Sequence, residues 1–183
     1  MLSIKKQSLV DMVYDKLREA IIQLKLPLGS KLNVNELQNQ IGVSCTPIRE
    51  AINRLQQEGL VVYENNVGAH IISLEPHDVL EIQQLAMTLH CAAIRLAMVN
   101  GDREVIVSEL KERLEEYVHA TNPHDEVMAV KEFLGTYYHN CGNRRLDRHM
   151  LAIQGQQTLL RHIYAANVKE RGAEAETYRQ MLD

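Results

Sequence analysis

The first 60 residues of the chain show a helical spacing of hydrophobic positions, interrupted by residues that favour turns. In the segment after Ser8, the apolar residues predict one buried helix face: Val10, Val13, Tyr14, Leu17, Ile21 and Leu24. Pro27 and Gly29 are expected to end this helix. Asn33, with Glu36 three positions later, is the expected cap of a second, short helix.

A third amphipathic helix begins close to Gly42, which can end the preceding helix in the left-handed conformation. Thr46 is its expected N-cap and Pro47 its first helical residue, where the missing N–H costs nothing. Hydrophobic residues at i, i+3, i+4 and i+7 give it one buried face: Ile48, Ala51, Ile52 and Leu55. The opposite face is polar and basic, with Arg49, Asn53 and Arg54. A short helix of this kind suits entry into the major groove of DNA.

The residues after Gly59 change to a strand pattern. Residues 60–63 are rich in β-forming side chains, residues 64–68 tolerate a tight turn, and residues 69–72 can form the returning strand. Three helices followed by a hairpin predict a winged helix-turn-helix domain over residues 1–74.

The remainder of the chain, residues 75–183, shows helical spacing throughout. Its hydrophobic stripes and breaking residues place five helices, near residues 79–97, 104–121, 125–140, 146–166 and 172–183. The predicted fold class is therefore mainly α, a winged helix-turn-helix followed by an all-α helical bundle. The last pattern still runs at Asp183, so we expect the bundle to be truncated or disordered at its C-terminal end.

Charge and composition sharpen this division. The chain of 183 residues has a net charge of −4, but residues 1–74 carry eight Lys/Arg against seven Asp/Glu, so the N-terminal domain is the expected anion-facing part. Three cysteines without a CxxC spacing indicate a reducing compartment and no disulfide or zinc framework. We find no signal peptide and no apolar run of about 20 residues, and so expect a cytoplasmic protein without a membrane partner.

Residue groups that would indicate catalysis are missing from the pattern. We find no nucleophile–base pair, no phosphate-binding glycine loop and no paired carboxylates at a suitable spacing, so an enzyme is not expected. His90, His139 and His162 lie on three predicted helices and could converge on a metal, but no histidine pair has the i, i+4 spacing of a helical metal site. The favoured interpretation is that these histidines are unrelated.

The N-terminal half resembles the GntR family of bacterial transcription regulators. The resemblance runs through residues 28–32, 36–37, 42–44, 46–51, 54–55, 58–61 and 68. The helical half is similar to the FCD ligand-binding domain of the FadR branch, through Phe133, Gly142, Asn143 and Leu146. The resemblance implies a homodimeric repressor that binds a pseudo-palindromic operator in double-stranded DNA. It also implies a small organic acid or similar metabolite in the helical domain that modulates operator binding.

Carried over by position, the resemblance gives a set of DNA-binding candidates: Lys31, Ser44, Cys45, Thr46, Arg49, Asn53, Arg54 and Gly68. Cys45 stands where the family usually has an arginine. Val67, directly before the wing residue Gly68, also stands where the family usually has an arginine. We therefore expect an operator that differs from the common one, or a lower affinity. The alternative for Arg49 is a surface ion pair with Glu50 or Glu58.

The helices that line the FCD cavity supply the effector-binding candidates: His90, Leu134, Tyr137, Tyr138, Arg161 and Tyr178. Val130, Leu134 and Tyr178 stand where many FCD domains have metal ligands, so we expect no metal and no cofactor. Ala86 and His90 replace an Arg and a Glu common in the first FCD helix. Two interpretations stay open, a receptor for a different and more apolar metabolite, and a DNA-binding dimer with a vestigial pocket that regulates without metal or metabolite.

Overall fold

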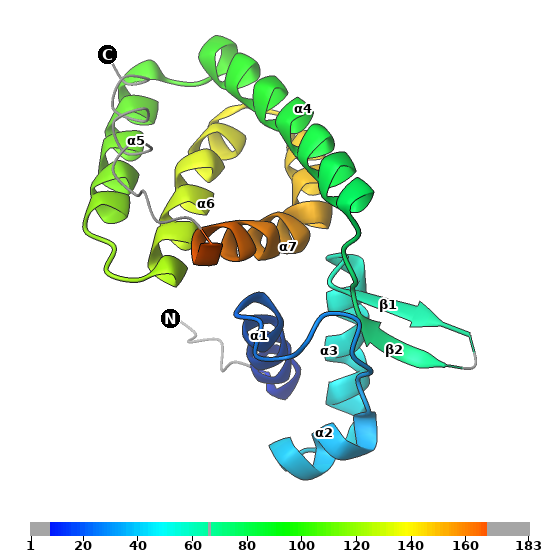
Figure 1. The fold of residues 1–183 in the computed structure, drawn as a ribbon. Coiled ribbons are helices and arrows are strands. Elements are labelled where there is room, and N and C mark those ends of the chain that lie inside the picture. The colour runs from blue at the N-terminus through cyan, green and yellow to red at the C-terminus, as the bar shows by residue number, and fades with distance from the viewer. Residues whose placement is uncertain (1–7, 66, 168–183) are drawn as a thin grey trace, which may run out of the picture. The chain divides into compact units, whose positions relative to one another are not determined.

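The computed structural model describes residues 8–65 and 67–167, and the chain divides into two compact units, Met1–Glu75 and Pro76–Asp183 (Figure 1). The predicted boundary lay one residue earlier, between residues 74 and 75. The predicted final helix over residues 172–183, with Tyr178, lies outside the described residues. Each unit is described by itself.

The first unit is a winged helix-turn-helix, which confirms the predicted fold class. Its elements are α1 (Leu9–Ile22), α2 (Val34–Ile41), α3 (Cys45–Gln57), β1 (Val61–Glu64) and β2 (Gly68–Ile71). The two strands pair antiparallel, from Val61 opposite Ile71 to Glu64 opposite Gly68. An isolated bridge between Lys31 and His70 adds the segment before α2 to the same small sheet.

Side-chain caps and one apolar core explain this unit. Ser8 and Asp11 form a reciprocal capping box at the start of α1, and Asn33 caps α2. Gly42 ends α2 with φ of 75°, in the left-handed conformation that glycine adopts without strain. The core joins α1, α3 and the wing through fully buried side chains: Val13, Ile21, Ile22, Ile48, Leu55, Leu60, Val61 and Ile71.

Two local predictions in this unit were wrong. The N-cap of α3 is Ser44, not Thr46, and Pro47 is the third helical residue rather than the first. Serine caps as well as threonine does, and proline costs no hydrogen bond anywhere in the first turn, so the sequence pattern allowed both starts. Leu24, which was expected on the buried face of the first helix, lies beyond α1 and is 40% exposed. The chain already reverses there: Leu24 has φ of 57°, and the Lys25 N–H donates to the Ala20 carbonyl.

The second unit is an all-helical bundle, also as predicted. Its described elements are α4 (Pro76–Asn100), α5 (Arg103–Val118), α6 (Pro123–Asn140) and α7 (Arg144–Asn167). Helix α6 packs against α4, α5 and α7, and α7 changes direction along its length (Figure 1). The core around α6 consists of buried hydrophobic residues: Ala93, Ala97, Ile106, Leu110, Leu114, Phe133, Tyr137, Tyr138, Cys141 and Met150.

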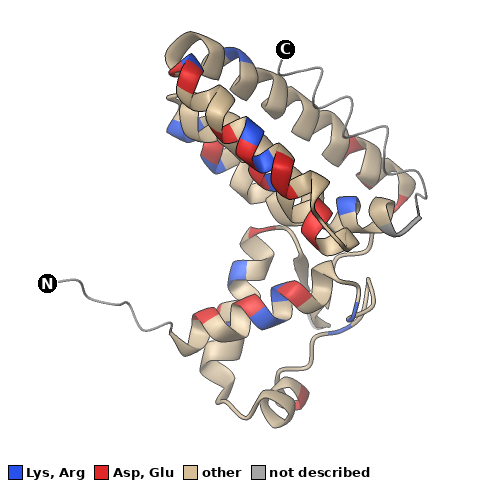
Figure 2. Cartoon of the chain, turned by 90° about the vertical axis from the view of Figure 1, so that its left-hand side faces the viewer, with Lys and Arg blue, Asp and Glu red and all other residues tan. Residues whose placement is uncertain are grey.

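The helices differ in what they expose. Acidic and basic residues alternate along α5, which gives it an ordinary solvated face (Figure 2). Helix α4 is the exception to the expected absence of a span-length apolar segment: among the described residues it is the one helix long and apolar enough to cross a membrane. Only 17% of its apolar window is buried within the chain. One such helix is weak evidence for a membrane.

Candidate nucleic-acid interface and effector cavity

The outer face of α3 is the candidate DNA-reading surface. Thr46, Arg49 and Asn53 are exposed and lie at i, i+3 and i+7, so they share one stripe opposite the buried Ile48 and Leu55. Within the described residues, the Arg49 guanidinium makes no hydrogen bond or ion pair, neither with Glu50 nor with Glu58. The surface-pair alternative for Arg49 is thus not what the structure contains, and its five N–H donors face solvent.

Other candidates on α3 are engaged inside the unit. The half-buried Cys45 thiol donates to Gln38 Oε1 at 2.8 Å, which turns it toward α2. Ser44 occupies the N-cap position in an extended conformation, and its side chain makes no capping hydrogen bond. Arg54 makes a 2.6 Å ion pair with Asp11 of α1. Hydrogen bonds from Ser8 and Arg54 lower the pKa of Asp11 to about 2, so this carboxylate stays charged as the partner of Arg54.

A second ion pair, which the sequence analysis missed, fixes α1 against α3. Glu58, the C-cap of α3, accepts hydrogen bonds from Arg18 and, at 2.8 Å, from the hydroxyl of Tyr14. The Arg18–Glu58 pair is mostly buried, at 2.7 Å. Burial and the neighbouring carboxylate raise the pKa of Tyr14 to about 12, so the phenol keeps its proton and remains a donor. The residues are 40 and 44 positions apart, and no local pattern connects them.

Two DNA-binding candidates, Lys31 and Gly68, lie close together at the wing. Gly68 has φ of 105° at the start of β2, and the Lys31 side chain passes close to it, with its Cε 3.7 Å from where a Cβ of residue 68 would lie. His70, which bridges to Lys31, has its Nδ1 3.1 Å from the Gly68 carbonyl oxygen. The exposed Lys31 is therefore a basic group of the wing and lies before the first residue of α2.

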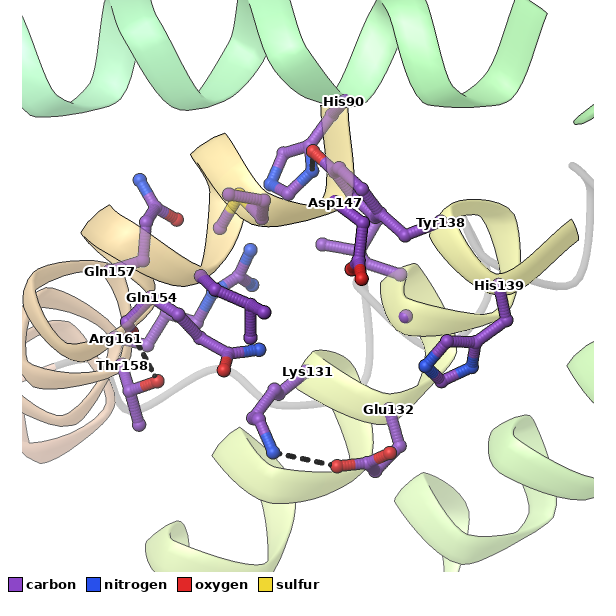
Figure 3. Close-up of a pocket in the computed structure, with 14 residues that line it drawn as sticks. His90, Lys131, Glu132, Tyr138, His139, Asp147, Gln154, Gln157, Thr158 and Arg161 are labelled. Atoms are coloured by element: carbon purple, nitrogen blue, oxygen red, sulfur yellow. Dashed lines mark hydrogen bonds and ion pairs between the residues drawn. The ribbon is translucent and has the colours of Figure 1, made fainter. Parts of the chain in front are cut away.

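The helical unit contains a cavity of about 200 Å³ lined by α4, α6 and α7 (Figure 3). Four of the six effector candidates line it, namely His90, Leu134, Tyr138 and Arg161. Tyr137 is instead a core residue, with its ring 6.4 Å from that of Phe133. The sixth candidate, Tyr178, is outside the described residues.

His90 and Tyr138 form the polar centre of the cavity wall. The Tyr138 hydroxyl lies 3.0 Å from His90 Nδ1. Burial, and then the charge of Arg161, lower the pKa of His90 to about 4, so the imidazole is neutral at pH 7. Burial likewise raises the pKa of Tyr138, which keeps the phenol protonated. His90 Nε2 is buried and, in the described part of the chain, has no hydrogen-bond partner.

The structure adds lining residues that the sequence analysis did not single out. Asp147, Leu151, Gln154 and Thr158 continue to Arg161 along α7 in steps of three or four residues, a helical stripe that the sequence could have revealed. His139 also lines the cavity, whereas His162 lies 3.1 Å from His124, so the three histidines do not converge. Among residues 8–65 and 67–167, no group of three or more His, Cys, Asp or Glu could hold a metal ion.

A winged helix-turn-helix head joined in one chain to a helical domain with a polar cavity is the architecture of one class of transcription regulators. Residues 9–71 match the family described as bacterial regulatory proteins, gntR family, and residues 81–183 match the FCD domain. The chain belongs to the GntR family, and it carries an FCD domain.

Two relatives agree with this assignment, and two solved structures share the fold. An HTH-type regulator from the TAR-I ttuE-ttuC' intergenic region of Agrobacterium vitis is 34% identical over 125 residues, covering 67% of this chain and 73% of the relative. The regulator YdhC of Bacillus subtilis is 29% identical over 143 residues, covering 75% of this chain but 64% of the relative. A crystal structure of a GntR regulator from Rhodococcus matches with a TM-score of 0.74 at 21% identity, over 94% of this chain and 83% of that one. The E. coli protein McbR/YncC matches with a TM-score of 0.69 at 22% identity, over 95% and 82%. Both structures are similar in fold.

Proposed function

We propose that this protein is a cytoplasmic, homodimeric, DNA-binding repressor whose operator binding is modulated by a small metabolite in the cavity of the helical unit. The observation that carries the DNA-binding part is the exposed stripe of Thr46, Arg49 and Asn53 on α3. Repression is supported by a relative described as a probable repressor of a D-xylose utilization operon in Paenarthrobacter nicotinovorans, 33% identical over 95 residues, covering 52% of this chain and 42% of the relative. The proposal includes no catalytic activity.

In this proposal α3 enters the major groove and Arg49 reads a guanine edge or grips a phosphate, with Thr46 and Asn53 beside it. Lys31 and the Gly68 backbone contact phosphate from the wing. Arg54 is held by Asp11 and contributes charge at the edge of the surface. Because phosphate neutralisation releases counterions, binding falls steeply as salt concentration rises.

Replacing Arg49 by alanine is expected to weaken binding to the preferred duplex by about 1–3 kcal/mol, because the substitution removes one bidentate contact. The duplex is obtained by selection from random double-stranded DNA, and the affinity is measured by fluorescence anisotropy. Arg148→Ala, at an exposed arginine of the helical unit, is the matched control and leaves affinity unchanged. Equal affinity of Arg49→Ala and wild type would show that α3 is not the reading helix.

The exposed apolar stripe of α4 supports the homodimer. Leu80, Met87 and Met98 are between 58% and 64% exposed, and with the exposed Gln84 and Cys91 and the partly buried Ile94 they repeat in alternating steps of four and three residues. This is the spacing with which two helices pack side by side, and no charged residue interrupts it. A second copy of the same chain offers the same stripe, so a two-fold pair buries both at once.

Met87→Glu is expected to raise the dissociation constant of the dimer by about tenfold to 100-fold, because two carboxylates enter the apolar contact. Analytical ultracentrifugation over a concentration series measures it. Thr88→Glu adds the same charge at the next, exposed position outside the stripe and leaves the dimer intact. Mild oxidation gives an independent readout: Cys91 lies near the middle of the stripe, and wild type, but not Cys91→Ser, forms a covalent dimer. A dimer insensitive to Met87→Glu rules out α4 as the interface.

The cavity supports a receptor rather than a vestigial pocket. A pocket without a ligand gains nothing from a buried, unpartnered ring nitrogen, since each such atom costs roughly 1–3 kcal/mol of stability. A ligand that forms a hydrogen bond with His90 Nε2 recovers this cost. The proposed receptor works without a metal or other cofactor.

A further inference from the structure

Several polar side chains around the cavity already have partners inside the chain. Lys131 and Glu132 form a 2.8 Å ion pair (Figure 3). The Thr158 hydroxyl donates to the backbone carbonyl of Gln154 at 2.7 Å. The hydrogen bonds that a ligand can make therefore depend on the side chains that these contacts leave over.

Asp147 and Gln154 are two such side chains, both on α7 and both half-buried. In the part of the chain that the structure describes, neither the Asp147 carboxylate nor the Gln154 side-chain amide makes a hydrogen bond or ion pair. Figure 3 shows both groups pointing into the cavity. The carboxylate only accepts hydrogen bonds, whereas the amide both donates and accepts. A ligand that satisfies both must therefore offer donors and acceptors.

The two groups lie at the two ends of one face of α7. They are seven residues apart, which is two helical turns, so their Cα atoms are separated by about 10 Å along the helix axis. Met150 and Leu151 lie between them on the same face and also line the cavity. This wall is polar at both ends and apolar between them, which suits a carbon chain or ring that carries polar groups along its edge.

His90, which lines the same cavity from α4, adds a further requirement. Its Nδ1 lies 3.0 Å from the Tyr138 hydroxyl, and its buried Nε2 has no partner among the described residues. Nε2 is a donor in one ring tautomer and an acceptor in the other. A ligand carboxylate would serve only the first tautomer and an ammonium group only the second. A hydroxyl serves both, and it also donates to the Asp147 carboxylate and pairs with the Gln154 amide.

We propose that the cavity binds a small, uncharged polyhydroxy compound, a polyol or monosaccharide, with hydroxyls on Asp147 and Gln154 and its carbon skeleton against Met150 and Leu151. This inference rests on the proposed function of the cavity as the effector site and names the ligand class. A volume of about 200 Å³ is below the range of about 300–1,000 Å³ of drug-sized sites, so the ligand is small. The Asp147 carboxylate opposes an acidic ligand by charge repulsion.

Calorimetric titration of the full chain tests the proposal. The probes are the aldopentoses, the aldohexoses and the alditols derived from them. Each is compared with an acid and an amine of the same carbon skeleton, for example glucitol with gluconate and glucamine, and glucose with glucuronate and glucosamine. At least one uncharged probe is expected to bind saturably, and at least about tenfold more tightly than its acid and its amine.

Two substitutions on α7 assign the binding to this wall. Asp147→Asn is expected to weaken the uncharged probe at least about tenfold and to narrow its preference over the acid, because the charged acceptor and the charge repulsion are both removed. A merely structural role of Asp147 would weaken the probe and its acid equally. Gln154→Met keeps the length of the side chain, loses the amide, and is expected to weaken the uncharged probe about tenfold. Glu112→Gln, which removes an exposed carboxylate of α5, is the matched control and changes neither the affinity nor the preference.

An acid or amine that binds as tightly as its uncharged counterpart would overturn the polyhydroxy proposal and keep the cavity as an effector site. The absence of saturable binding by every uncharged probe would also overturn it. Neither result touches the DNA-binding proposal, because duplex binding by wild type and its loss in Arg49→Ala are measured without ligand. Conversely, wild type that binds no duplex but binds a polyol or monosaccharide would refute the regulator and keep the site.

Discussion

Replacing Gly101 by alanine is expected to destabilise the helical unit by about 3 kcal/mol, at the upper end of the range for overpacking. Gly101 joins α4 to α5, and its N–H donates to the Ala97 carbonyl at 2.8 Å. A Cβ at this position would lie 2.6 Å from Ile106 Cδ1, 2.8 Å from the Ala97 oxygen and 3.0 Å from the Asn140 oxygen. The Ile106 methyl can move, but the two carbonyl oxygens belong to the backbones of α4 and α6.

The stability of the helical unit is measured by unfolding in urea, with hydrogen exchange in peptides of α5 and α6 as the probe, because a chain of two units need not unfold in one step. Gly135→Ala is the matched control. Gly135 lies inside α6, and its nearest neighbour to an added Cβ is His139 Cε1 at 3.9 Å. Alanine is there expected to stabilise the unit by up to about 1 kcal/mol, since glycine is a poor helix former. A loss below about 1 kcal/mol for Gly101→Ala would contradict the close approach of α4, α5 and α6.

The helical unit is also expected to lose up to about 3 kcal/mol of stability as the pH falls from 6.5 to 4. Burial and Arg161 lower the pKa of His90 from 6.5 to about 4. In this interval the unfolded chain takes up a proton that the folded unit does not, so the free energy of unfolding falls as the pH falls. The contribution is fully present above pH 6.5 and is lost by about pH 4.

The contribution of His90 is obtained by comparing the pH dependence of wild type with that of a variant without this histidine. The free energy of unfolding is measured at a series of pH values between 7 and 4 for wild type and for His90→Gln, which cannot titrate. The wild type is expected to show the steeper dependence. His149→Gln removes an exposed histidine of the same unit and keeps the wild-type slope. If His90→Gln showed the same pH dependence as wild type, His90 would not be a buried neutral group in the folded unit.

Much of this architecture follows from local sequence. The hydrophobic spacing in α1, α2 and α3 fixes which face of each helix is buried, because the helical period alone decides which side chains share a face. Arg49 was found in this way: a residue opposite Ile48 and Leu55 must be exposed once the helix packs. Errors arose where two local solutions have nearly equal energy, as with Ser44 and Thr46 at the start of α3.

The long-range ion pairs could not be predicted in this way. Arg54 and Asp11 are 43 residues apart, and Arg18 and Glu58 are 40 apart, so only the packing of α1 on α3 brings them together. The same is true of the cavity. Its α7 stripe has a helical spacing, but the meeting of Asp147, Arg161 and His90 depends on where α7 changes direction and how α4 and α6 pack.

The sequence by itself determined the two-part organisation, the winged helix-turn-helix head and the exposed Arg49 face, because each depends on spacing within one element. Only the tertiary structure decided which polar groups are paired and which are left for a ligand. It holds Arg54 with Asp11, leaves Arg49 without a partner among the described residues, and buries His90 Nε2 in a residue that lines the cavity. Pairing depends on distances between elements that are far apart in the chain, and no periodicity within one element contains them.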